Sequence, residues 1–128
     1  MGYTILLVDD STTIRNVLIQ VFGMTQLPLD DVHQAGDGIE ALKVLESRWV
    51  DIVFCDINMP RMNGVELIRN MRENPEYKDI PIVVISTEGS KTRMNELESI
   101  GINSYLRKPC RPEEVRDVIH EILGEWND

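Results

Sequence analysis

Short apolar runs alternate along the chain with longer segments in which apolar residues recur every three or four positions. The short runs are typical of buried strands, and the longer segments are typical of helices with one buried face. This alternation of strand and helix builds parallel sheets from strand–helix–strand units. We predict strands at Ile5–Val8, Val32–Ala35, Ile52–Cys55, Ile82–Ile85 and Ser104–Leu106.

Five helices are predicted between and after these strands. The first and the last repeat apolar residues at the spacing of one buried face: Ile14, Val17, Leu18, Val21 and Phe22, and Val115, Val118, Ile119, Ile122 and Leu123. The middle three cover about Gly38–Arg48, Val65–Met71 and Ser90–Ile100. The last of these has few apolar residues, so we expect it to pack loosely and to stop at Gly101.

Strand composition also predicts which strands lie at the edges of the sheet. Strands that are covered on both faces read as continuous apolar runs, as the first, third and fourth do. The second contains His33 and Gln34, and the fifth begins with Ser104, so both belong at the edges. We therefore predict an α/β fold, a flavodoxin-like (βα)5 doubly wound parallel sheet with strand order 2-1-3-4-5.

Groups with complementary chemistry follow these strands. Asp9 and Asp10 come after the first strand and Asp56 after the third, while Ser86 ends the fourth and Lys108 follows the fifth. Because the carboxyl ends of parallel strands share one edge, we expect these side chains to converge on a crevice between the first and third strands.

Three carboxylates in one crevice imply a cation. At an effective dielectric of about 20, each pair would repel by a few kcal/mol. Oxygen ligands without His or Cys favour Mg²⁺ or Mn²⁺ over Zn²⁺. Such an ion, together with Lys108, would form a socket for a dianion such as a phosphoryl group.

Each of these residues also has a structural reading when it is taken alone. Asp9 and Asp10 could cap the following helix, Asp56 could be a turn residue, and Ser86 and Lys108 could be a strand-end hydroxyl and a solvated charge. Their joint position at one edge favours a functional site.

Length and charge narrow the possible functions. The chain has 128 residues, which suits one domain over residues 1–128, and its net charge of −9 argues against nucleic acid and anionic membranes as partners. No apolar run approaches a membrane span and no signal peptide is apparent, so we expect a cytoplasmic protein.

Cys55 and Cys110 lack a CxxC pairing and are interpreted as structural thiols.

Four segments in order carry a family resemblance: LLVDDS at 6–11, DINMPRMNG at 56–64, VVIST at 83–87 and YLRKP at 105–109. With these spacings the chain resembles the response-regulator receiver domain of two-component systems over nearly its whole length. The resemblance implies a signalling module, not an enzyme that turns over substrate. Its partners would be a histidine kinase or phosphotransfer protein as the phospho-histidine donor, and an output protein.

The resemblance also implies the roles of the residues around the crevice. Asp56 would be the phosphoacceptor, and Asp9 and Asp10 would bind the metal together with Asp56 and the backbone carbonyl of Asn58. Lys108 would contact the phosphoryl oxygens. The chemistry of the residues agrees, because phosphoryl transfer needs positioning and charge neutralisation above all.

Further roles concern the switch and the lifetime of the signal. The resemblance implies that Ser86 is the switch hydroxyl and Tyr105 the switch aromatic, acting on the face of the fourth helix, fifth strand and fifth helix. It also implies that Asn58 and Glu88 tune dephosphorylation and that the peptide bond between Lys108 and the next residue is cis.

Two residues depart from the family pattern, and two other functions fit part of it. Cys110 stands where a bulky apolar residue often follows the Lys-Pro pair. Thr87 stands where a small residue is common, and we expect it to crowd the path of Tyr105. A Mg²⁺-dependent aspartyl-phosphate phosphatase would need a second acid where Asn58 stands. A phosphorylation-independent pseudo-receiver would not need the complete acceptor set. The chain fits a stand-alone regulator or a fragment of a longer one.

Overall fold

The computed structural model describes residues 2–87 and 89–124, in which five strands alternate with five helices. The strands are β1 Tyr3–Val8, β2 Leu29–Ala35, β3 Ile52–Cys55, β4 Ile82–Ser86 and β5 Ser104–Arg107. The helices are α1 Thr12–Gly23, α2 Gly38–Ser47, α3 Gly64–Glu73, α4 Lys91–Ile100 and α5 Pro112–Leu123. Each predicted element is present; the largest difference in strand bounds is at β2, which begins at Leu29 instead of Val32.

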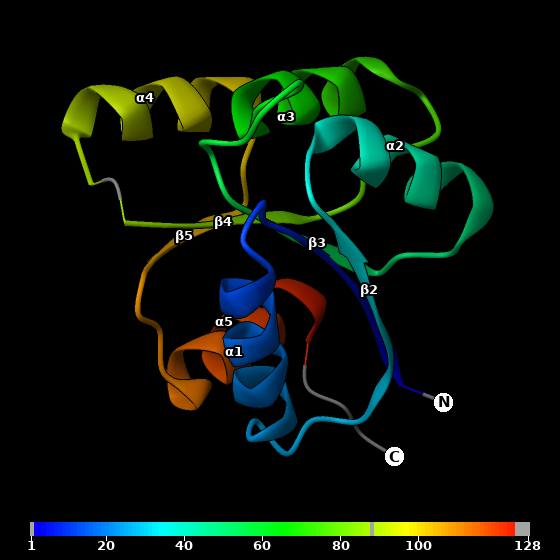
Figure 1. Cartoon of the computed structure of the whole chain (residues 1–128), viewed down its shortest axis with the longest axis vertical. Helices are drawn as coiled ribbons and strands as arrows, with labels where there is room; N and C mark the ends of the chain where they lie inside the picture. The colour runs from blue at the N-terminus through cyan, green and yellow to red at the C-terminus, as the bar shows by residue number, and fades with distance from the viewer. Residues whose placement is uncertain (1, 88, 125–128) are drawn as a thin grey trace.

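All paired strands are parallel, and their order is β2-β1-β3-β4-β5, which confirms the prediction. Helices α2, α3 and α4 cover one face of the sheet, and α1 and α5 cover the other (Figure 1). Alternate residues of β1 supply two cores: Leu6 and Val8 face the first group of helices, while Ile5 and Leu7 face the second. The central strands are therefore buried on both faces, as their apolar composition predicts.

Capping residues define where the helices begin. Ser11, Asp37, Asn63 and Ser90 each accept a hydrogen bond from a backbone N–H in the first turn of α1, α2, α3 and α4. Helix α4 ends at Gly101, whose φ of 103° is left-handed, as expected for a C-terminal stop. The strand ends and helix starts are thus fixed at one edge of the sheet.

Helix α4 has few buried residues, as predicted, but one prediction for α1 is wrong. Leu97 is the one buried residue of α4. Val17 of α1 is 53% exposed, although the helical pattern placed it on the buried face. The apolar stripe of α1 is wider than its buried contact, and Val17 instead lines a hollow with Pro109 and Cys110. In the described part of the chain, no helix has the length and apolarity to cross a bilayer.

Candidate functional site

The three predicted acids meet at the carboxyl ends of β1 and β3. Asp9, Asp10 and Asp56 each offer a carboxylate oxygen, and these oxygens lie within 4.8 Å of one another. The pairing of Val8 with Cys55 brings the two strand ends together, and the Asp56 N–H donates to the Val8 carbonyl at 2.9 Å. We call Asp9, Asp10 and Asp56 the acid cluster.

Lys108 lies between two members of the acid cluster. Its Nζ is 2.6 Å from Asp9 Oδ2 and 3.2 Å from Asp56 Oδ2, and its side chain is only 11% exposed. Burial by itself would lower the pKa of this ammonium, but the hydrogen bonds and charges of Asp9 and Asp56 outweigh burial and raise the pKa. Lys108 therefore stays charged and links the end of β5 to β1 and β3.

Backbone groups fix the directions of two carboxylates in the acid cluster. Asp56 Oδ1 accepts from the Ile57 N–H at 2.7 Å, and Asp9 Oδ1 accepts from the Ser11 N–H at 2.9 Å. Asp9 is buried, whereas Asp10 is exposed. The cluster thus has a buried, ordered side and an open side from which a ligand can enter.

Ser86 and Tyr105 lie on β4 and β5, the two strands that follow β3 across the sheet. Ser86 is 1% exposed at the end of β4, and the Ser86 carbonyl accepts from the Lys108 N–H at 3.0 Å. The Tyr105 hydroxyl is buried and has no hydrogen-bond partner among the described residues. Thr87 is exposed, and its crowding of the path of Tyr105 stays a prediction.

The remaining predicted residues are placed as follows. Asn58 is exposed two residues past Asp56, while Glu88 lies outside the described residues. The Lys108–Pro109 peptide bond is cis, as predicted. Cys55 and Cys110 are both free and buried, which confirms the predicted burial of Cys55, and burial raises the pKa of the Cys55 thiol.

Sequence reasoning missed an ion pair beside the acid cluster. Arg61 Nη2 lies 2.6 Å from Asp37 Oδ2, which bridges the loops that follow β3 and β2. Asp37 follows β2 at the edge where the acid cluster lies, so the strand-end argument could have found it. Nothing in the sequence indicates that Arg61 reaches across to it.

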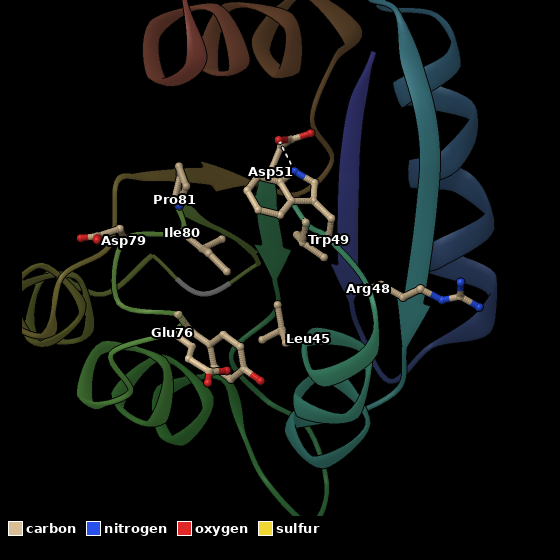
Figure 2. A pocket seen from close by; sticks show the side chains of 10 residues that line it. Leu45, Arg48, Trp49, Asp51, Glu76, Asp79, Ile80 and Pro81 are labelled. Atoms are coloured by element: carbon tan, nitrogen blue, oxygen red, sulfur yellow. Dashed lines mark hydrogen bonds between the residues drawn. The ribbon is translucent and has the colours of Figure 1, made fainter. Parts of the chain in front are cut away.

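A separate hollow of about 320 Å³ lies at the opposite edge of the sheet, between the end of α2 and the loop before β4. Figure 2 shows Trp49 beside it, with the indole N–H donating to Asp51 Oδ1 at 2.8 Å. We call it the Trp49 hollow. Its acids do not form a group that could hold a metal within residues 2–87 and 89–124. The acid cluster is therefore the candidate functional site.

The comparisons with known proteins agree with this geometry. The family profile of the response regulator receiver domain matches residues 5–120. The chemotaxis protein CheY homolog of Campylobacter jejuni is 36% identical over 121 residues, which cover 94% of this chain and 92% of that protein. Chemotaxis protein CheY1 of Helicobacter pylori is 34% identical over 121 residues, 94% and 96% of the two chains.

Solved structures show the same fold. CheY4 of Vibrio cholerae superposes with a TM-score of 0.85 at 30% identity, covering 95% of this chain and 99% of that chain. The receiver domain of sensor histidine kinase PA1611 from Pseudomonas aeruginosa has a TM-score of 0.85 at 23% identity, with coverage of 98% and 100%, and coordinates magnesium in its active site cleft. The chain therefore belongs to the response regulator receiver domain family, the CheY-like signalling proteins of two-component systems.

Proposed function

We propose that this receiver takes a phosphoryl group from a phospho-histidine donor onto Asp56 and then changes the binding of an output protein. The observation that carries the proposal is the acid cluster with Lys108 bonded to two of its members. A cluster of unpaired acids would be only repulsive, but here a buried ammonium already prepares the site for a dianion.

The acid cluster fits a hard divalent cation. Its carboxylate oxygens are close enough to share one ion, and oxygen ligands suit Mg²⁺ or Mn²⁺. We propose that Asp9, Asp10, Asp56 and the backbone carbonyl of Asn58 hold it, as magnesium is held in the cleft of the PA1611 receiver, which has the same fold. When bound, the ion supplies positive charge that offsets the acids and the incoming phosphoryl group.

The residues of the chain itself position the transfer. A carboxylate oxygen of Asp56 forms the bond to phosphorus while the bond from phosphorus to the donor imidazole nitrogen breaks. The Ile57 N–H and Lys108 hold Asp56 in one orientation, so little reorganisation is needed. Lys108 remains beside the transferred group, where its charge stabilises the phosphoryl oxygens.

An apolar hollow beside the site supports docking of the donor there. Ile14, Val17 and Val21 of α1 line it together with Pro109, and it reaches Lys108. Because Val17 is exposed in this hollow, and Lys108 both lines the hollow and contacts the acid cluster, we place the phospho-histidine protein against α1.

For the output, we propose the surface made by α4, β5 and α5. Ser86 connects this surface to the acid cluster, and Tyr105 lies on β5. Helix α4 buries a single residue fully, Leu97, so its local stability should be low and a small bias can shift it. Asn58 and Glu88 are proposed to set how long the phosphoryl group remains.

Intact-mass analysis after incubation with acetyl phosphate and Mg²⁺ tests the phosphoacceptor. We expect one phosphoryl group on the wild type and none on Asp56→Asn, because the amide oxygen is a poor nucleophile. The control is Asp51→Asn, which changes the acid that precedes β3 instead of the acid that follows it. Equal labelling of the wild type and Asp56→Asn would refute the assignment.

A further inference from the structure

The loop that carries Asn58 is held to the neighbouring loop by Arg61. This loop runs from Asp56 to the start of α3, beside the loop between β2 and α2. Arg61 Nε lies 2.7 Å and Nη2 2.6 Å from Asp37 Oδ2, and Nη2 also lies 3.4 Å from Glu40 Oε2. Two nitrogens of one guanidinium therefore share one carboxylate oxygen.

We propose that Arg61 is a positioning residue for the metal site, acting through Asp37 to fix the backbone at Asn58. This inference rests on the proposed function, in which the Asn58 carbonyl binds the divalent ion. The ion pair of Arg61 and Asp37 is called the loop clamp below.

The loop clamp differs from an ordinary surface ion pair. The Asp37 side chain is only 4% exposed, although the Arg61 side chain is 56% exposed. Burial by itself would raise the pKa of Asp37, but the Glu40 N–H and Arg61 outweigh it and lower the pKa. A buried carboxylate is costly without its partner, so the pair should persist where exposed pairs fluctuate.

The anchor of the clamp is itself rigid. Asp37 Oδ1 accepts from the Glu40 N–H at 2.9 Å and so caps α2. The next residue, Gly38, donates its N–H to the Met62 carbonyl at 2.9 Å. A Cβ at Gly38 would lie 2.5 Å from Met62 Cγ, so the loop and the start of α2 touch at a glycine.

The ends of the loop are fixed independently of the clamp. The Gly64 N–H donates to the carbonyl of the buried Ile57 at 2.8 Å, and Asn63 forms a capping box with Glu66. Residues 58–62 therefore form a short arch between two fixed ends. Arg61 and Met62 hold the second half of this arch against Asp37 and Gly38 at the start of α2.

Backbone conformation supports the role of the clamp. Arg61 has a φ of 61°, in the left-handed region that residues with a side chain seldom adopt. Asn58, at the start of the same arch, is exposed. The position of its carbonyl thus depends on the conformation of the arch, and we infer that loss of the clamp lets this carbonyl move.

A purely electrostatic role for Arg61 predicts the opposite result. A positive charge near the acid cluster repels Mg²⁺, so its removal would tighten metal binding. A positioning role predicts that removal weakens binding, because the ligand set is no longer held in place. The direction of the change separates the two.

Titration calorimetry of unphosphorylated protein with Mg²⁺ tests the clamp. We expect Arg61→Ala to raise the dissociation constant about tenfold. Arg61→Lys should raise it less, since lysine keeps the charge but lacks the planar guanidinium with two nitrogens on one carboxylate. Asp37→Asn should act in the same direction, because asparagine keeps the α2 cap but loses the ion pair. The double variant Arg61→Ala, Asp37→Asn should be no worse than either single variant.

The matched control is Arg69→Ala. Arg69 has nearly the same exposure, 54%, and pairs with Glu96 at 3.7 Å, so we expect an unchanged dissociation constant. Thermal unfolding without Mg²⁺ reports stability separately; a merely structural role would lower the melting temperature and leave Mg²⁺ binding as it is.

The outcomes separate this inference from the proposed function. An unchanged or tighter Mg²⁺ constant in folded Arg61→Ala overturns it, as do additive losses in the double variant. Should Arg61→Ala fail to fold, Arg61→Lys and Asp37→Asn decide by the same criterion. If the wild type neither binds Mg²⁺ nor labels on Asp56, the proposed function fails instead, whereas a labelled wild type with an unaffected clamp variant overturns this inference alone.

Discussion

Strand β3 has an aspartate at each end, and the two carboxylates have different partners. Asp56 follows the strand and joins the acid cluster, where Lys108 lies 3.2 Å from its Oδ2. Asp51 precedes the strand and uses its two oxygens on the Thr4 N–H and the Trp49 indole, both at 2.8 Å. The first carboxylate faces other acids, and the second is satisfied locally.

The comparison teaches that acid content does not make a site. The Trp49 hollow is lined by Asp51, Glu76 and Asp79, as many acids as the acid cluster holds. In Figure 2, the Asp79 carboxylate points away from Trp49. Within residues 2–87 and 89–124, three carboxylates converge only at the carboxyl ends of β1 and β3, where two of them contact the buried ammonium of Lys108. This convergence creates a demand for a cation.

The largest expected effect is on the rate of phosphorylation. Lys108→Ala removes the fixed positive charge from the acid cluster, so we expect labelling by acetyl phosphate to slow by about a hundredfold. Time-resolved intact-mass analysis measures the rate. Lys78→Ala, which removes an exposed lysine between Glu76 and Asp79, serves as the control. Equal labelling rates in Lys108→Ala and the wild type would contradict the role of the buried ammonium in setting the acid cluster apart from the acids of the Trp49 hollow.

A smaller effect concerns metal and stability. On the proposal that Mg²⁺ binds the native acid cluster and not the unfolded chain, Mg²⁺ at roughly a hundred times its dissociation constant should raise the free energy of unfolding by about 3 kcal/mol. The double variant Asp9→Ala, Asp10→Ala should lose this gain, whereas Glu76→Ala, Asp79→Ala at the opposite edge should keep it. Denaturant unfolding with and without Mg²⁺ measures it; a gain that survives loss of Asp9 and Asp10 contradicts the metal site.

The smallest effects concern one aromatic residue near each edge. The Tyr105 hydroxyl is buried without a partner in the described residues, so Tyr105→Phe should stabilise the fold by about 1 kcal/mol. Trp49 is 78% exposed, so Trp49→Ala should change stability by less than about 0.5 kcal/mol. Denaturant unfolding of both variants measures this. Destabilisation by Tyr105→Phe would mean that the phenol has a partner after all.

Residue chemistry and strand order were sufficient to predict the fold and the convergence of the acids with Lys108. These predictions depend on local sequence and on one topological rule, that parallel strands end at a common edge. The same rule, applied to β2, would also have predicted that Asp37 lies at this edge. The domain extent over residues 1–128 and the cytoplasmic location stay predictions.

What the sequence could not supply depends on packing between elements. The exposure of Val17 follows from how much of α1 is covered, which the helical period does not record. The buried hydroxyl of Tyr105 depends on how its side chain packs against the core under α2, α3 and α4. Arg61 pairs with Asp37 from a left-handed backbone position, and the sequence does not predict a positive φ at a residue that has a side chain.

The arch of residues 58–62 has a consequence for what can be inserted or deleted in this chain. Its ends are pinned at Ile57 and Asn63, and a Cβ at Gly64 would collide with the Asp56 carbonyl, so neither end can slide. One residue added to the arch must displace Asn58, Arg61 or the start of α3, whatever its side chain. In this segment the length of the chain is therefore constrained as well as the identity of Arg61.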